Sequence, residues 1–253
     1  MSELFLLSER QMARLSPFFP LSHGVPRVDD RRVISGIIYV IKHGLQWKDA
    51  PKAYGPHKTL YNRFVRWSLL GVFDRIFTAL AREGAKTDRI MIDATHLKAH
   101  RTAASLAQKG AFPRCLGRTK GGLNSKLHAV CDADGKPVLL HLTAGPVSDH
   151  KGARDLLEHL PQAGALIADR GYDSNWFRQE LAARGIAPCI PGRKHRKQAI
   201  DYDKALYKQR HKVENMFAKL KDWRRIATRY DRCAHTFRAA INIAASVAFY
   251  LKE

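Results

Sequence analysis

Two short apolar segments that each end in an aspartate constrain this sequence more than any other feature. Residues 89–93 read Arg-Ile-Met-Ile-Asp, and residues 165–169 read Ala-Leu-Ile-Ala-Asp. Continuous apolar runs of this length are typical of parallel strands that are buried on both faces. Ligands of open α/β sheets bind beyond the carboxyl ends of such strands. The sequence therefore predicts central strands that place Asp93 and Asp169 at one end of a sheet.

The spacing of apolar residues changes near residues 84–87. Before this point the spacing is helical, and the first predicted helix opens with a capping box formed by Ser8 and Gln11. After it, strands alternate with helices, and the Asp-Ala-Asp-Gly turn at 132–135 predicts a hairpin. We predict an α/β fold, in which a mixed sheet with flanking helices follows a small all-helical domain. The predicted domains are residues 1–84 and 88–253.

Net charge is the second strong constraint. The chain has 44 Lys and Arg against 23 Asp and Glu, which gives +21. This exceeds the usual net charge of a small domain several-fold and favours a polyanion over a small molecule as the partner.

No run approaches the roughly 18 apolar residues that a membrane helix needs. The first residues lack the basic region of a secretory signal, and the four cysteines form no CxxC pair. We expect a cytoplasmic protein without membrane contact, zinc site or disulfides.

Two aspartates at adjacent strand ends would repel each other unless a cation lay between them. Oxygen-only ligands are what Mg²⁺ prefers, and this ion also takes phosphate oxygens. The alternative is that Asp93 and Asp169 each cap the loop that follows, since aspartate is common at such positions.

A long helix predicted near residues 203–225 offers a third carboxylate. One face of it is apolar, and a polar stripe runs along the edge of that face: Tyr207, Arg210, Glu214 and Lys221. Glu214 is the only acid on this stripe, and it would complete a three-carboxylate site. The alternative is an ordinary amphipathic helix in which Glu214 pairs with Arg210 four residues earlier.

The combination resembles bacterial insertion-sequence transposases of the DDE type. The stripe reproduces the family's spacing of Tyr, two residues, Arg, three residues, Glu, six residues and Lys. Residues 92–95 look like the family's first Asp segment, and residues 168–173 look like its second. The N-terminal part is similar to the helical domain of the insertion-sequence-five family, related to the insertion-sequence-four superfamily, at residues 47–51, 54–56 and 61–64. The late run at residues 224–231 also resembles the family.

The resemblance implies a ribonuclease H-like catalytic domain with Asp93, Asp169 and Glu214 as catalytic metal ligands. The expected cofactor is Mg²⁺, with Mn²⁺ as a substitute. The implied enzyme is a DNA transposase, which cuts at the ends of its element and joins them to target DNA by phosphoryl transfer. Tyr207, Arg210 and Lys221 would then hold phosphates near the cut. The expected partner is double-stranded DNA bound by a dimer, without a small-molecule substrate, in the bacterial nucleoid.

Two basic groups are candidates for DNA contact. The first precedes the Glu214 helix and is interpreted as a clamp on the DNA backbone: Arg193, Lys194, Arg196 and Lys197. The second lies on a predicted N-terminal helix, where Arg63 and Arg66 suggest a helix-turn-helix-like reader of the element ends. The alternatives are a solvated charge run for the first group and a plain helical bundle for the second.

Two alternative functions stay open at this point. One is a metal-dependent nuclease of the same fold without strand transfer, and the other is a catalytically decayed DNA-binding protein. Two further acids, Asp149 and Asp173, lie near the predicted site. Each precedes a predicted helix, and we interpret both as helix caps.

Overall fold

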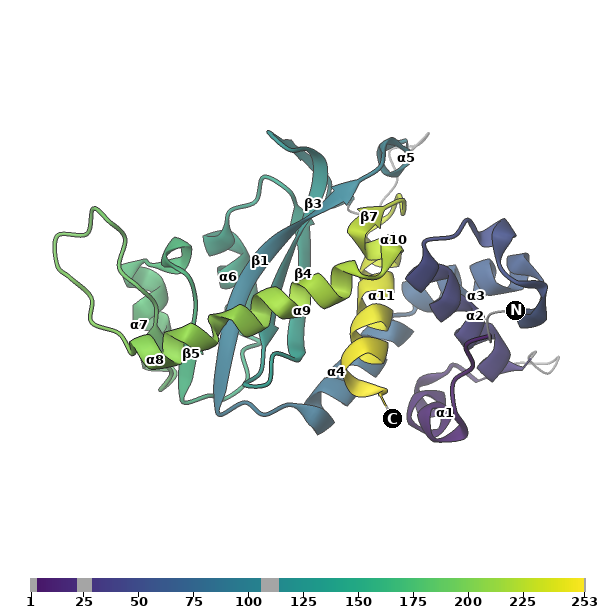
Figure 1. Ribbon diagram of the computed structural model, residues 1–253, viewed down its shortest axis with the longest axis horizontal. Helices are drawn as coiled ribbons and strands as arrows, with labels where there is room; N and C mark the ends of the chain where they lie inside the picture. Colours follow the sequence, from purple (N-terminus) through teal and green to yellow (C-terminus); the bar gives the residue numbers. More distant parts are fainter. Residues whose placement is uncertain (1–3, 22–28, 106–113, 253) are drawn as a thin grey trace. The chain divides into compact units, whose positions relative to one another are not determined.

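The computed structural model describes residues 4–21, 29–105 and 114–252, and within them the chain forms two compact units (Figure 1). The first unit comprises residues 1–80, 100–114 and 220–253, and the second comprises residues 81–99 and 115–219. This division differs from the predicted domains 1–84 and 88–253. Residues 220–253 group with the N-terminal helices because α11 (Ala234–Ala245) packs against α2 (Asp30–His43) and α3 (His57–Leu69).

The first unit is helical, and its caps are set by local sequence. The capping box of Ser8 and Gln11 begins α1 (Glu9–Leu15) as predicted. Asp29 caps α2, whose chain leaves the helix at Gly44 with a left-handed φ of 65° that glycine tolerates without strain. This region also contains α4 (Val72–Gly84), α5 (Arg101–Ala104), α10 (Arg224–Ala227) and β7 (Thr228–Arg229).

A mixed sheet forms the centre of the second unit. The strand order is β2-β3-β1-β5-β6, and β4 pairs with β3. β1 is antiparallel to β3 but parallel to β5, which is in turn parallel to β6. The hairpin predicted around residues 132–135 is the turn between β3 and β4. The bounds are β1 Arg89–Ala99, β2 Gly117–Thr119, β3 Gly122–Cys131, β4 Pro137–Ala144, β5 Ala165–Ile167 and β6 Ala187–Cys189.

Strand β1 continues six residues beyond Asp93, so the prediction that this aspartate ends its strand is wrong. Residues 94–98 are more polar, but they keep pairing with β3, from Ala94 opposite His128 to Lys98 opposite Asn124. Backbone hydrogen bonds to β3 therefore extend the strand past the end of its apolar run.

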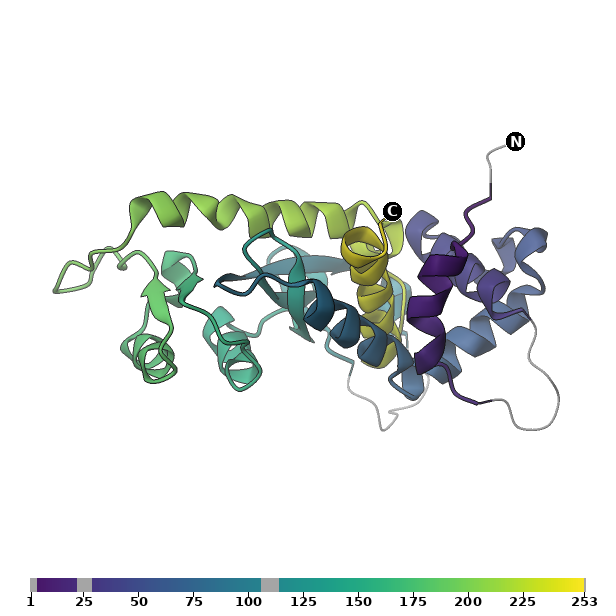
Figure 2. The same ribbon diagram turned by 90° about the horizontal axis from the view of Figure 1, so that it is seen from below.

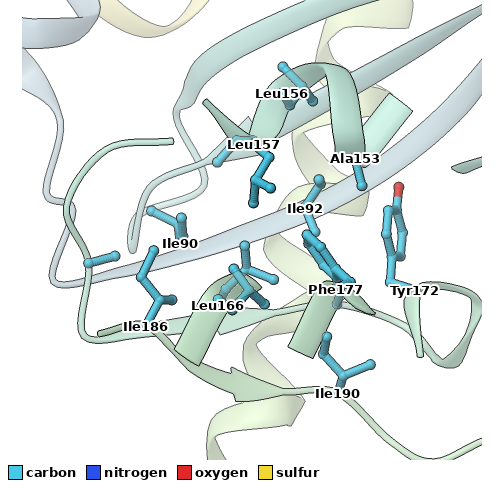
Figure 3. Packing of buried hydrophobic residues seen from close by; sticks show 14 residues of the cluster. Ile90, Ile92, Ala153, Leu156, Leu157, Leu166, Tyr172, Phe177, Ile186 and Ile190 are labelled. Carbon is cyan, nitrogen blue, oxygen red and sulfur yellow. The ribbon is translucent and has the colours of Figure 1, made fainter. Parts of the chain in front are cut away.

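Helices cover both faces of this sheet (Figure 2). α6 (Asp149–Leu157) and α7 (Asn175–Ala183) lie on one face, and α9 (His211–Lys221) runs along the other. Figure 3 shows the core under α6 and α7, where Ile90 and Ile92 of β1 pack with Leu156 and Phe177. Alternate residues of a strand point to opposite faces, so Asp93 points toward the face that carries α9.

The helix predicted near residues 203–225 is divided into three parts. α8 (Lys204–Tyr207) is followed by a 3-10 turn at Lys208–Arg210, and α9 ends at Lys221. In the described residues, no helix is long and apolar enough to cross a membrane.

Candidate active site

Asp93 and Asp169 stand at matching positions on neighbouring strands. β1 and β5 are parallel, and Met91 pairs with Ile167. Two residues further on, the chain reaches Asp93 within β1 and Asp169 just beyond β5. Because parallel strands advance together, the two aspartates lie at the same level of the sheet.

The carboxylate of Asp93 is largely removed from water. Its side chain is 19% exposed, and Ala94 donates a backbone hydrogen bond to it at 2.8 Å. Burial raises the pKa of Asp93 to about 6, although the Ala94 hydrogen bond and the charge of Arg210 lower it. The negative charge of Asp169 raises this pKa further. At neutral pH Asp93 is therefore a poorly solvated carboxylate that a nearby cation stabilises.

Arg210 connects Asp93 to Glu214. Its Nη1 donates to Oδ2 of Asp93 at 2.9 Å, and its Nη2 donates to Oε1 of Glu214. Burial opposes the charge on Arg210, but the two carboxylates raise its pKa above the ordinary value. The pair between Arg210 and Glu214, which the sequence also allowed as an ordinary helix pair, is thus part of a chain of three residues that reaches β1.

The donor set fits a hard divalent cation. Asp93 and Asp169 lie at matching positions of neighbouring strands, and Glu214 shares with Asp93 a positive group that lies between them. Carboxylate oxygens are the ligands that Mg²⁺ and Mn²⁺ accept. Among the residues that the structure describes, no three His, Cys, Asp or Glu side chains are already grouped as a metal site. In this arrangement the guanidinium of Arg210 is the positive group that lies between Asp93 and Glu214.

The other two members of the polar stripe lie at its ends. Tyr207 is the last residue of α8, and its ring packs edge-on against Tyr202 with 5.4 Å between the ring centroids. Lys221 is the last residue of α9, where burial lowers the pKa of its ammonium group. Lys221 belongs to the first unit, whereas Asp93, Asp169 and Glu214 belong to the second.

Comparison with known proteins identifies the family. Residues 84–249, more than half of the chain, match the family described as "Transposase DDE domain". Residues 7–77 match the family described as "Putative transposase of IS4/5 family". The chain belongs to the DDE transposase family. The resemblance found in the sequence motifs is thereby confirmed, and so is the function as a DNA transposase.

Two relatives come from insertion sequences. The chain is 36% identical over 126 residues to the "Putative transposase for insertion sequence element IS6501" of Brucella ovis, covering 49% of this chain and 97% of that protein. It is 33% identical over 149 residues to the "Putative transposase for insertion sequence element IS402" of Burkholderia cepacia, covering 51% of this chain and 68% of that protein.

The predicted ribonuclease H-like fold is also confirmed. This DDE transposase resembles the piggyBac transposase, whose structure was determined by cryo-electron microscopy in a synaptic complex with hairpin DNA. The TM-score is 0.53 at 10% sequence identity, and the alignment covers 95% of this chain and 70% of that chain. At this identity the likeness shows a shared fold.

The two acids interpreted as helix caps have other partners in this DDE transposase. Ser148 caps α6, and Asp149 instead accepts a 2.9 Å hydrogen bond from Nζ of Lys126. Ser174 caps α7, and Asp173 instead pairs with arginines described below. Both cap predictions are wrong, because the serine in each case holds the extended backbone immediately before the helix. Sequence reasoning also missed Lys126, whose only signal was a lysine inside an otherwise buried strand.

The basic cluster before α8 separates into two kinds of residue. Arg193 and Arg196 are bound to neighbouring parts of the second unit, the latter through two hydrogen bonds to Asn175 at 2.8 and 2.7 Å. Lys194 and Lys197 are exposed. Arg193 is exposed as well, but its guanidinium is hydrogen-bonded within the unit, so the two lysines are the more available members of the predicted DNA clamp.

The two arginines of the predicted DNA reader also differ. Arg63 pairs with Asp30 and lies over the ring of Trp67, 5.0 Å from its centroid. Its side chain is only 11% exposed, so it joins α3 to α2. Arg66 is exposed on the same helix.

The run at residues 224–231, which resembles the family, is mostly structural. Arg225 forms two 3.0 Å hydrogen bonds with Asp231 and lies over the ring of Trp47, 5.3 Å from its centroid. Arg229 is fully buried and donates to the carbonyl oxygens of Asp231 and Arg114, each at 2.8 Å. Arg225 therefore neutralises a buried carboxylate, and Arg229 satisfies buried backbone oxygens of the first unit.

Proposed function

We propose that this transposase cuts DNA at the ends of its insertion sequence and joins them to target DNA, with Asp93, Asp169 and Glu214 as its catalytic carboxylates. The observation that carries the proposal is the guanidinium of Arg210 shared by Asp93 and Glu214, at the level of Asp169. Three acids held near one positive group, in a chain of net charge +21, suit a reaction on a phosphodiester.

The proposed cofactor is Mg²⁺, with Mn²⁺ as a substitute, held by Asp93, Asp169 and Glu214. When bound, such a cation would stabilise charge that develops on the scissile phosphate. The raised pKa of Asp93 supports this assignment, because a desolvated carboxylate gains most from a cation close by.

The protein's own groups would bind and orient the DNA. Arg210 has a planar fork that matches two phosphate oxygens, and it already lies beside Asp93. Lys221 would act as a point charge and Tyr207 as a hydroxyl donor on the same stripe. We assign DNA backbone contact to Lys194 and Lys197 because both are exposed.

The N-terminal helices are proposed to read the element ends, with Arg66 as the exposed candidate for base or phosphate contact. Two ends must be brought together before they can be joined, so we propose that two copies act together on DNA. A protein engaged in this way would be found with the nucleoid.

The test uses the full chain and linear DNA that carries the element's own end. Cleaved and joined products are measured separately, with Mg²⁺, with Mn²⁺ and with a chelator. We expect both products with either metal and neither product with the chelator. Cleavage without joining would establish a nuclease instead. Metal-independent cleavage would refute the three-carboxylate site.

A further inference from the structure

The turn that follows Asp169 is braced by Arg193. This turn is a 3-10 segment at Arg170–Tyr172, and the guanidinium of Arg193 donates to two of its carbonyl oxygens. Nη2 of Arg193 lies 3.0 Å from the oxygen of Gly171, and Nε lies 3.4 Å from the oxygen of Arg170. Nη2 also lies 2.6 Å from Nε2 of His150 at the start of α6. One side chain thus ties the turn to a neighbouring helix.

Asp173 fastens the same turn from its other end. Its carboxylate accepts hydrogen bonds from the backbone N–H of Arg193 and from Nε of Arg178, both at 2.8 Å, and Arg196 lies 3.2 Å away. Asp173 is 4% exposed. Burial alone would raise the pKa of Asp173, but these hydrogen bonds and charges lower it below the ordinary value. Asp173 is therefore ionised, and its carboxylate is held by the backbone of Arg193 and the side chain of Arg178.

The position of the turn decides where the carboxylate of Asp169 points. Oδ1 of Asp169 accepts a 2.8 Å hydrogen bond from the backbone N–H of Gly171. A Cβ at Gly171 would lie 2.8 Å from that oxygen, so a larger residue at this position would displace the Asp169 carboxylate. Asp169 also faces repulsion from Asp93 at the same level of the sheet. Any movement of the turn would therefore move the Asp169 carboxylate with it.

We propose that Arg193 and Asp173 are positioning residues for Asp169, and that they hold the Arg170–Tyr172 turn in place against the repulsion between Asp169 and Asp93. This inference rests on the proposed role of Asp169 as a catalytic carboxylate. It gives Arg193 a different role from the DNA clamp predicted by the sequence. Asp173, which lies close to the acidic site, supports that site without joining it.

The test compares Arg193→Gln, Arg193→Lys and Arg184→Gln in the full chain. Arg184 is an exposed arginine at the end of α7, so its replacement removes the same charge without touching the turn. Three quantities are measured for each variant: the cleavage rate at saturating end-bearing DNA with Mg²⁺, the salt dependence of DNA affinity, and the melting temperature. Binding of Mn²⁺ to the DNA-free protein is followed by calorimetry.

Arg193→Gln should lower the saturated cleavage rate by roughly 10- to 100-fold and weaken Mn²⁺ binding, as is typical for partners that orient a metal ligand. Arg193→Lys keeps the charge but not the planar fork, so its cleavage rate should stay low while its salt dependence matches the wild type. Arg184→Gln should retain the wild-type cleavage rate. All three proteins should melt as cooperatively as the wild type.

Two results would overturn the inference. If Arg193→Lys restored cleavage, or if Arg193→Gln only flattened the salt dependence and kept the saturated rate, Arg193 would be a charge contact to DNA. Asp173→Asn provides a second check, because it removes the charge that fastens the turn without changing the residue's size. A wild-type cleavage rate in Asp173→Asn would likewise refute the proposed positioning role. A wild-type protein that failed to cleave DNA with either metal would contradict the proposed function instead.

Discussion

The guanidinium of Arg210 meets the carboxylate of Asp93 at 2.9 Å, although the two residues are 117 positions apart in the sequence. The same guanidinium binds Glu214, so a residue of strand β1 and a residue of helix α9 share one positive group. The pair between Arg210 and Glu214, which by itself would contribute little to the free energy of folding, is thereby part of an acidic site.

Replacing Glu214 with Gln separates catalysis from packing. The change keeps the size of the side chain, which is 55% exposed, and removes one carboxylate from the proposed metal site. Cleavage at matched DNA occupancy should fall at least roughly 10²- to 10³-fold, because metal-based charge stabilisation is lost. The free energy of unfolding should change by no more than about 0.5 kcal/mol, as for other exposed pairs. Asp93→Asn and Asp169→Asn serve as references. Substantial cleavage in Glu214→Gln, with both references inactive, would place the third ligand elsewhere.

The exposed lysines of the basic cluster should contact DNA without sequence preference. Replacing Lys194 and Lys197 with Gln should weaken binding to all DNA sequences alike. The slope of log affinity against log salt should become shallower by about 1.8, since each phosphate contact contributes about 0.9. The measurement is fluorescence anisotropy over a range of salt concentrations, with Arg184→Gln as a matched loss of charge. An unchanged slope in the double variant would show that these lysines face solvent only.

Replacing Arg63 should change the stability of the protein, whereas replacing Arg66 should change its preference among DNA sequences. Arg63→Gln removes the ion pair with the mostly buried Asp30, and it should destabilise the protein by about 1–3 kcal/mol. Arg66→Gln should leave the melting temperature unchanged but lower the preference for the element's own ends over unrelated DNA. Calorimetry and competition binding measure the two effects. The N-terminal reader would lose its support if Arg66→Gln bound both DNAs with wild-type preference.

His128 should make stability depend on acid pH. Its ring is fully buried, binds Oγ1 of Thr143 at 2.9 Å and faces Gly152, where a Cβ would come within 2.1 Å of Nδ1. Burial lowers the pKa of His128 to about 4 from 6.5. Between these values the unfolded chain binds a proton that the native protein does not, so stability falls as pH decreases from 6.5 toward 4.

The size of this effect has an upper limit of roughly 3.5 kcal/mol, at about 1.4 kcal/mol per pH unit. Urea unfolding at pH 7.5 and pH 5, in the presence of a chelator, should show a smaller loss of stability for His128→Gln than for the wild type. His159→Gln, a change at an exposed histidine, should behave like the wild type. Equal losses in His128→Gln and the wild type would mean that His128 does not titrate in this range.

The sequence by itself determined the parts that depend on neighbours in the chain. The apolar runs that lead to Asp93 and Asp169, the stripe that carries Glu214, and the turn at residues 132–135 all arise from local spacing and turn chemistry. Each of these features is present in the structure. These features predicted the α/β fold, and the resemblance of the motifs to a known family predicted the transposase.

Only the tertiary structure decided which groups meet across the chain. Pairing with β3 carries β1 beyond Asp93, and packing of α11 on α2 and α3 places the C-terminal segment with the N-terminal helices. The same holds for charged side chains, since Arg193 donates to the carbonyl oxygens of a turn and Arg63 pairs with Asp30. The physical reason is that the sequence of a charge run does not distinguish a paired basic residue from a solvated one. Its partner is set by the carboxylates and carbonyl oxygens that folding brings within hydrogen-bond distance.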